Sequence, residues 1–252
     1  MRGALEARPV ATVKIGSEQI EPRLSLLALG LAMVAALAGI AGCRAGPAGA
    51  PSPPAVTALP EITLPPPPEQ NQMSLEQAIT QRRSVRSFTD RELTQSQLSQ
   101  LLWAAQGITD PRGLRAAPSA GALYPLELYV ISSGGLYHYR PDGHRVVTLA
   151  EEDLRQAVWE AGLKQDALRD APAVFLIAAV YQRTENKYGE RAERYVHLEA
   201  GHAAQNLLLQ AVALGLGGVP IGAFDDDQLQ SALSLPKDHA PLYLIPVGYP
   251  AE

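Results

Sequence analysis

The chain has 252 residues, and its 26 acidic residues outnumber its 21 lysines and arginines, which leaves a formal charge of −5. Nucleic-acid binding depends on a broad basic surface that displaces counterions from phosphates, so this balance argues against a nucleic-acid partner. Cys43 is the only cysteine, which excludes a disulfide within the chain and argues against a thiolate-bound metal.

The N-terminal region contains an uncharged apolar run over residues 24–40, preceded by Arg23. A run of 17 residues is short for a spanning helix but suits the core of a signal peptide. It ends in Ile-Ala-Gly-Cys, which resembles the lipobox of bacterial lipoproteins, where cleavage precedes the cysteine and the cysteine carries the lipid. We expect a signal peptide over residues 1–43, lipidation of Cys43, and export to the periplasmic or cell-surface side of a bacterial membrane. An uncleaved membrane anchor is the alternative.

Prolines are concentrated between residues 47 and 67, where the sequence reads PAGAPSPPAVTALPEITLPPP. This composition favours extended polyproline geometry and cannot bury a core. We therefore predict a linker over residues 44–71 and one globular domain over residues 72–252, which is long enough to bury a sizeable core.

The first predicted helix covers residues 75–82, because Ser74 and Gln77 form a capping box ahead of it. Thr94 and Gln97 repeat this pattern and begin a second helix, whose apolar residues share one face. A glycine can end the second helix, and a loop rich in proline and glycine follows it.

Residues 126–132 alternate in polarity, and the turn signals SGG and PDG follow at short spacing. This pattern predicts a three-stranded meander. Residues 172–180 form a continuous apolar run of strand length, which is typical of a buried central strand. The other expected elements are a helix over 151–163, a long helix over 191–214, a short strand after it, a helix over 225–235 and a final strand over 241–250.

The second half of the long predicted helix is apolar on most sides. Such a helix is buried all round, often because a second subunit covers it. Taken together, the elements predict an α+β fold, in which helices pack against a small mixed sheet.

The stretch QRRSVRSF, residues 81–88, concentrates positive charge and hydroxyl groups. If the chain is extended beyond the helix end, Arg82, Ser84 and Arg86 can converge on one phosphate, because guanidinium groups match phosphate oxygens. The alternative is that Arg82 and Arg83 end the helix in contact with solvent.

Two glycine-containing stretches are further candidates, APSAGALYP at residues 117–125 and GLGGVPIGAF at residues 215–224. Small residues let the backbone approach a flat ligand, and Ser119 can hydrogen-bond to a ring edge. The alternatives are a surface loop and a helix stop followed by a turn. The second stretch follows a helix and lacks the G-x-G-x-x-G pattern, so a dinucleotide-binding fold is disfavoured.

A fourth block, residues 186–206, gathers Lys187 and Tyr188 with His197, Glu199 and His202. The last three do not have the spacing of an HExxH zinc motif, so we predict no metal site. A histidine such as His202 is more often a hydrogen-bonded core residue than a catalyst. The sequence has no G-x-S-x-G elbow of a serine hydrolase.

In their order, RRSVRSF, PSAGALYP and ALGLGGVPIGAFDDDQL resemble the nitroreductase superfamily of FMN-dependent oxidoreductases. The stretch GGLYHYRPDGH and the block KYGERAERYVHLEAGHAAQNLLL resemble more narrowly its SagB-type branch, the thiazole/oxazole (azoline) dehydrogenases. The resemblance covers residues 74–250, almost the whole predicted globular domain, and these motifs are specific as an ordered set.

The resemblance implies a nitroreductase-like homodimer joined through its long helices, with FMN at the subunit boundary. It implies that residues of the arginine–serine stretch surround the phosphate and that residues of the two glycine-containing stretches contact the isoalloxazine. It also implies that Lys187 and Tyr188 form the catalytic pair that removes a proton. The implied cofactor-binding residues are Arg82, Arg83, Ser84, Arg86, Pro118, Ser119, Gly121, Val219, Ile221 and Gly222.

The implied activity is ping-pong hydride transfer through flavin N5, with a small-molecule substrate and with NAD(P)H as a candidate reductant. One alternative is a lipoprotein of the same fold that binds flavin or another ligand without turnover, and a second is an NAD(P)H-dependent nitro- or quinone reductase. Unlike many superfamily members, the chain has no basic residue after the last predicted strand. Arg82 and Arg86 are then expected to carry more of the phosphate contact.

Overall fold

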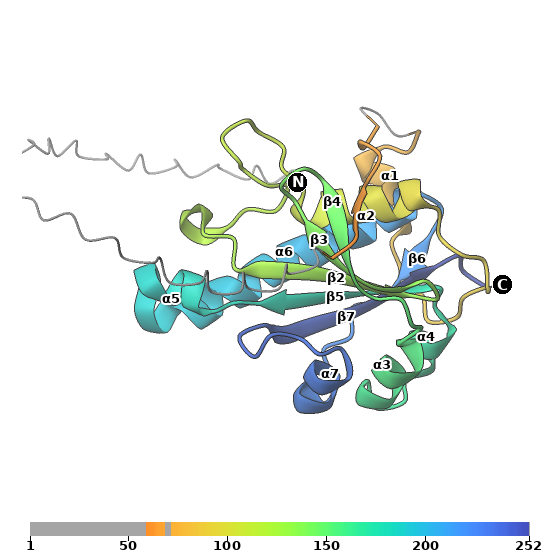
Figure 1. The fold of residues 1–252 in the computed structure, drawn as a ribbon. Helices are drawn as coiled ribbons and strands as arrows, with labels where there is room; N and C mark the ends of the chain where they lie inside the picture. Colours follow the sequence, from red (N-terminus) through yellow and green to blue (C-terminus); the bar gives the residue numbers. More distant parts are fainter. Residues whose placement is uncertain (1–58, 69–71, 252) are drawn as a thin grey trace, which may run out of the picture. The chain divides into compact units, whose positions relative to one another are not determined.

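The computed structural model describes residues 59–68 and 72–251. Its centre is a seven-stranded sheet with the order β1-β4-β3-β2-β5-β7-β6 (Figure 1). The strands are β1 Glu61–Thr63, β2 Leu126–Ser132, β3 Gly135–Arg140, β4 Arg145–Ala150, β5 Ala173–Ala179, β6 Gly217–Gly218 and β7 Ala240–Gly248. All neighbouring strands in the described residues pair antiparallel. The sequence predicted a mixed sheet, but the one parallel contact among these residues is an isolated bridge between Ser84 and Gly218.

Helices cover both faces of the sheet (Figure 1). One face carries α1 Leu75–Gln81, α2 Gln95–Gln106 and α6 Ala192–Ala213, and the other carries α3 Arg155–Ala161, α4 Asp166–Asp170 and α7 Asp226–Ala232. A further helix, α5 Gln182–Tyr188, connects β5 to α6, and single 3-10 turns cover Ala120–Ala122 and Gly189–Arg191. The predicted α+β class is confirmed, although α4 and α5 were not expected from the sequence.

Local sequence signals explain where the first helices begin. Ser74 accepts a hydrogen bond from the Gln77 backbone, and the Gln77 side chain accepts one from the Ser74 backbone, which completes the capping box. Thr94 and Gln97 form the same arrangement at α2. Because these bonds join residues three apart, both helix starts were visible in the sequence.

The strand at the centre of the sheet is buried on both sides. Phe175 and Ile177 of β5 face α2 and α6, whereas Val174 and Leu176 face α3, α4 and α7. All seven residues of β5 are buried. The continuous apolar run therefore forms the predicted central strand.

Part of the predicted linker belongs to the sheet, so the linker prediction over residues 44–71 is wrong for residues 59–68. β1 pairs with β4, the Leu64 side chain is buried, and the Pro65 carbonyl accepts a hydrogen bond from the Ser99 hydroxyl. A strand flanked by prolines is tolerated because β1 lies at the sheet edge, where one side of its backbone needs no partner. The predicted signal peptide and Cys43 lie outside the described residues.

The long helix α6 is not buried on every side within one chain. Ala203 and Leu207 lie in the core, whereas Leu198 is 53% exposed, and His202 and Gln205 are exposed as well. The expectation of a core histidine at His202 is therefore wrong.

No helix within residues 59–68 and 72–251 is long and apolar enough to cross a membrane.

Candidate active site

The arginine–serine stretch leaves α1 as an extended segment. Arg82 has φ −57° and ψ 123°, and beyond it the Val85 amide donates a hydrogen bond of 3.1 Å to the Gly218 carbonyl. A Cβ at Gly217 would lie only 2.5 Å from Val85 Cγ2, so glycine is needed for this close approach. The arginine–serine stretch (residues 81–88) and the glycine-containing stretch at residues 215–224 therefore lie side by side.

The arginines of this stretch differ in their surroundings. Arg83 Nη1 donates to the Thr80 and Arg82 carbonyls at 2.9 and 2.8 Å, so Arg83 ends the helix as the alternative reading expected. Within the described residues, the side chains of Arg82, Ser84 and Arg86 have no hydrogen-bond or ion-pair partner. These three groups are thus available to an anion, and Arg83 is already engaged.

The glycine-containing stretch at residues 215–224 exposes fewer of its predicted ligand-contacting residues than the sequence suggested. The side chains of Val219 and Ile221 are buried in the core, with 3% and 7% exposure. The Ile221 amide and carbonyl are both bonded to Leu244, at 2.8 and 2.9 Å. Only Gly222 of the three predicted residues is exposed, so Val219 and Ile221 act through packing.

The loop over residues 118–124 has an unusual backbone. Gly121, Ala122 and Tyr124 have φ values of 63°, 54° and 48°, in the left-handed region. For residues with a side chain this conformation costs on the order of 1 kcal/mol or more each, and such strain clusters at functional sites. Ser119 Oγ accepts a hydrogen bond of 2.9 Å from the Tyr124 amide and holds the loop, while Pro118 is exposed.

The predicted catalytic pair converges on this loop from α5. A Cβ at Gly121 would lie 2.8 Å from the Tyr188 hydroxyl oxygen and 2.9 Å from Lys187 Nζ. The Tyr188 ring is fixed edge-on against Tyr195, with 5.0 Å between ring centroids. Lys187 and Tyr188 are thus brought together with Gly121, and their catalytic role stays a prediction.

A buried carboxylic acid lies next to the same loop. Glu199 on α6 is 3% exposed, and burial raises its pKa to about 7, against smaller lowering effects from Ser119, Arg115 and Gln106. Its Oε1 atom has no hydrogen-bond partner among the described residues. A carboxyl group that exchanges its proton near neutral pH is suited to proton transfer.

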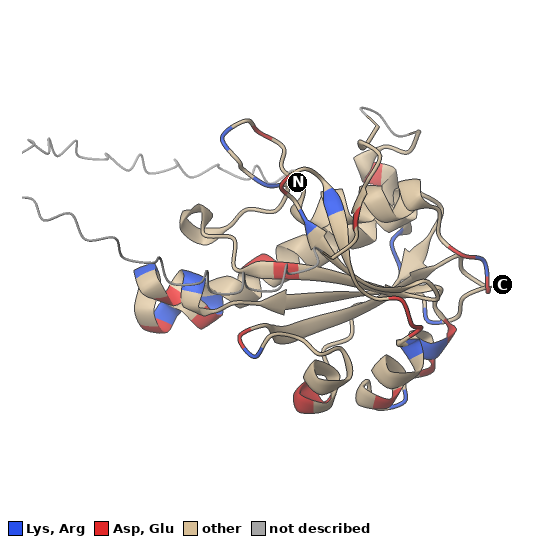
Figure 2. Ribbon diagram, in the orientation of Figure 1, with Lys and Arg blue, Asp and Glu red and all other residues tan. Residues whose placement is uncertain are grey.

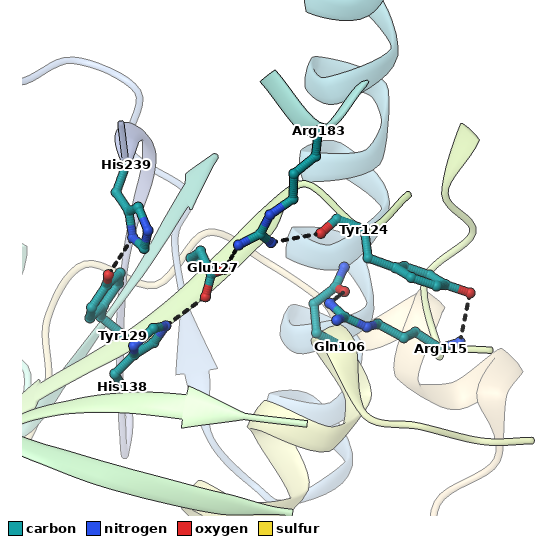
Figure 3. A network of polar contacts seen from close by, with 8 residues as sticks. All are labelled: Gln106, Arg115, Tyr124, Glu127, Tyr129, His138, Arg183 and His239. Atoms are coloured by element: carbon teal, nitrogen blue, oxygen red, sulfur yellow. Dashed lines mark hydrogen bonds and ion pairs between the residues drawn. The ribbon is translucent and has the colours of Figure 1, made fainter. Parts of the chain in front are cut away.

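Arg115 links this acid to a second polar network. Its Nη1 donates to Gln106 Oε1 at 2.9 Å, and its guanidinium lies 4.4 Å from the centre of the Tyr124 ring (Figure 3). The Tyr124 carbonyl accepts a 3.0 Å hydrogen bond from Arg183 on α5, whose other amino group pairs with Glu127. The strained loop is therefore tied to both α2 and α5.

The Glu127 carboxyl anchors the network within the sheet (Figure 3). Burial alone would raise its pKa, but hydrogen bonds from His138, at 2.6 Å, and Arg183 lower it to about 2. His138 stacks on Tyr129, whose hydroxyl lies 2.5 Å from His239 Nδ1. Because ionised Glu127 can only accept, its charge is held by two donors and remains over the physiological pH range.

Sequence reasoning missed this network and Arg115. The sequence did contain an indication of Glu127. It lies on the same face of β2 as Tyr129 and Ile131, and these two residues are in the core. An acidic residue at a core-facing position needs a partner, which predicts a buried ion pair without identifying it. Arg115 carried no comparable signal, because it lies in an irregular loop.

Charged residues also gather on α5 and the first turns of α6, in contrast to the sparsely charged central strands (Figure 2). His197 there lies 2.7 Å from the Tyr181 hydroxyl, away from the Glu199 carboxyl in the core. Residues 59–68 and 72–251 contain no group of three histidine, cysteine or acidic residues able to hold a metal ion.

The fold and site define an α+β domain that holds a strained loop, a lysine–tyrosine pair and a buried acid together. The model of the Nitroreductase family matches residues 79–249. The chain therefore belongs to the nitroreductase family, whose members are oxidoreductases.

Three similar proteins illustrate this relationship. Two are described as "putative nitroreductase". The one from Methanocaldococcus jannaschii is 44% identical over 191 residues, 73% of this chain and 96% of that protein. The crystal structure of the other, from Ralstonia eutropha JMP134, has a TM-score of 0.70 and 32% identity, covering 76% of this chain and 90% of that chain. A Bacillus subtilis protein named as an NAD(P)H FMN reductase is 28% identical over 189 residues, 69% of this chain and 65% of that protein.

Proposed function

We propose that this protein is an FMN-dependent oxidoreductase. The observation that carries the proposal is the convergence of Lys187 and Tyr188 on Gly121, within a loop whose strained backbone is held by Ser119. The residues fit FMN in two respects. Arg82, Ser84 and Arg86 offer open donors to a phosphate, and Gly121, without a side chain, lets the Lys187 amine and the Tyr188 hydroxyl approach the loop that the resemblance assigns to the flavin ring.

In this proposal the protein supplies binding and proton transfer. Bound FMN would supply hydride chemistry at N5 in two half-reactions, which is the basis of a ping-pong scheme. Tyr188 and Lys187 present a hydroxyl and an amine at one point, where either can exchange a proton with a substrate. The nearby Glu199 holds or releases a proton around neutral pH and can restore the protonation state of the site.

The resemblance to SagB-type enzymes favours dehydrogenation of a small substrate. The name of the Bacillus subtilis relative instead favours a reductase that takes electrons from NAD(P)H, and we retain this as the second candidate. The two functions differ in the first half-reaction. A reductase is reduced by NAD(P)H within one turnover, whereas a dehydrogenase is reduced by its substrate.

We further propose a homodimer in which α6 meets its counterpart. Leu198, His202 and Gln205 lie on one face of α6 and are exposed in the single chain. A partially apolar helix face of this kind is stabilised when a second copy covers it. Sedimentation equilibrium measures the assembly directly, and a monomer at all concentrations would contradict this arrangement.

The flavin proposal is tested by the visible spectrum of the purified full-length chain with added FMN. We expect a retained yellow chromophore, and we expect Arg82→Ala with Arg86→Ala to weaken FMN retention by about 2–5 kcal/mol, because each removes a charge-assisted bond. Arg83→Ala is the matched control, because Arg83 is engaged with α1. A colourless wild-type protein would refute the cofactor assignment.

The proton-transfer roles are tested in protein that retains FMN. We expect Lys187→Met and Tyr188→Phe to lower turnover while the flavin spectrum stays unchanged, since neither change removes a phosphate contact. Stopped-flow mixing with NADH or NADPH then separates the two candidates, because rapid bleaching of the flavin supports the reductase. Unchanged turnover in both variants would remove the proposed proton-transfer pair and leave the cofactor assignment standing.

A further inference from the structure

A cavity of about 710 Å³ opens beside the strained loop, on the side where Arg115 and Tyr124 line it. Its other walls come from β1, the end of α2, the β2–β4 meander and α5. This volume lies within the range of small-molecule sites, about 300–1,000 Å³. The cavity therefore has room for a ligand of its own.

The charges of the cavity do not balance. Four arginines line it against three acidic residues, which leaves one excess positive charge. Arg145 is paired with Glu61 at 3.1 Å, and Arg183 is paired with Glu127. Of the two remaining arginines, Arg140 lies on the exposed hairpin, where water screens its charge.

Arg115 holds the excess charge in a partly buried position. Among the described residues its guanidinium has no carboxylate within ion-pair distance, and its one hydrogen-bond partner is the neutral Gln106 side chain. The Tyr124 ring, 4.4 Å away, and Gln106 fix its orientation. An oriented guanidinium that keeps free N–H groups matches the two oxygens of a carboxylate.

The rest of the lining combines polar and apolar side chains. Ile108, Leu126, Leu128 and Val147 place apolar side chains around the cavity. A single excess positive charge suits a monoanion, because a phosphate dianion would leave the cavity, with its three carboxylates, negatively charged. We propose that this cavity binds a small monocarboxylic acid, and that Arg115 is its counter-charge.

The test is a calorimetric titration of the purified full-length chain with benzoate. We expect saturable binding of benzoate and at least about tenfold weaker binding of the neutral isostere benzamide, because benzamide cannot use the charge of Arg115. Equal affinity for benzoate and benzamide, or no binding of benzoate, would each overturn the proposal.

Variants locate the binding in this cavity. Arg115→Gln should weaken benzoate binding by about tenfold to 100-fold, the scale of one charge-assisted interaction. Arg112→Gln is the matched control, since Arg112 lies in the same loop but is exposed and paired with Asp110 at 2.8 Å. Unchanged affinity in Arg115→Gln would refute the assignment.

A second variant covers the case in which Arg115→Gln does not fold. Ile108 is 40% exposed and lines the cavity, so Ile108→Trp narrows the cavity without enlarging a core residue. We expect it to weaken benzoate binding, and full retention of binding would overturn the proposal. The titration measures acid binding without reference to flavin colour, so its failure would leave the FMN proposal intact.

Discussion

The raised pKa of Glu199 predicts a specific pH dependence of stability. The folded protein holds the carboxyl proton up to a pH of about 7, whereas an ordinary glutamate in the unfolded chain releases it near 4.5. Folding therefore takes up a proton between these values, and the free energy of unfolding falls as the pH rises through this window. The Glu199→Gln variant keeps a neutral amide at every pH and should lose this dependence.

The magnitude follows from the two pKa values. Each unit of difference corresponds to about 1.4 kcal/mol, so the full effect is about 3 kcal/mol, of which about 2.5 kcal/mol falls between pH 5 and pH 8. Urea unfolding of the wild type and Glu199→Gln at both pH values measures it. From pH 5 to pH 8, the free energy of unfolding of Glu199→Gln relative to that of the wild type should rise by this amount. The contributions of the other titrating groups cancel in this difference, because both proteins contain those groups.

A matched control comes from the same helix. Glu193 lies in the first turn of α6 and is exposed, so Glu193→Gln should leave the pH dependence as in the wild type. If the stability difference between Glu199→Gln and the wild type is the same at pH 5 and pH 8, the burial argument for Glu199 is wrong.

Two further predictions concern other parts of the chain. Gly217→Ala should destabilise the fold by about 1–3 kcal/mol and weaken FMN retention, because its Cβ would meet Val85 at 2.5 Å and displace the arginine–serine segment. Denaturant unfolding measures the loss of stability. Val85→Ala in the same chain should restore part of it. We also propose that the mature protein is a lipoprotein, so its intact mass should correspond to a chain that begins at Cys43 with attached acyl groups, and Cys43→Ser should prevent this processing. A species that still begins at Met1 without acyl chains would contradict cleavage.

The boundary of the linker illustrates where local reasoning was insufficient. The run from residue 47 to residue 67 has the composition of an extended tether, and a short strand within it was not expected. β1 forms because β4 presents an open edge and Leu64 finds a buried position. The β4 strand lies far from β1 in the sequence, so composition alone could not identify the pairing.

The local features were predictable from the amino-acid sequence: the two capping boxes, the meander and the buried β5 strand, together with the order of the family motifs. The helix starts, the turns and the single strands depend on residues close together in the chain, where spacing alone decides which groups can meet. The sequence also identified Lys187 and Tyr188 as candidates, but through resemblance to a family.

Which of these features share a site depends on how the distant elements pack. The tertiary structure placed Gly121 against Lys187 and Tyr188, buried Glu199 beside the same loop, and left Arg115 without a carboxylate partner. Burial and charge pairing depend on every element that packs around a group. Because those elements are distant in the chain, the pKa of Glu199 and the unbalanced cavity follow from the packed fold and not from any stretch of sequence.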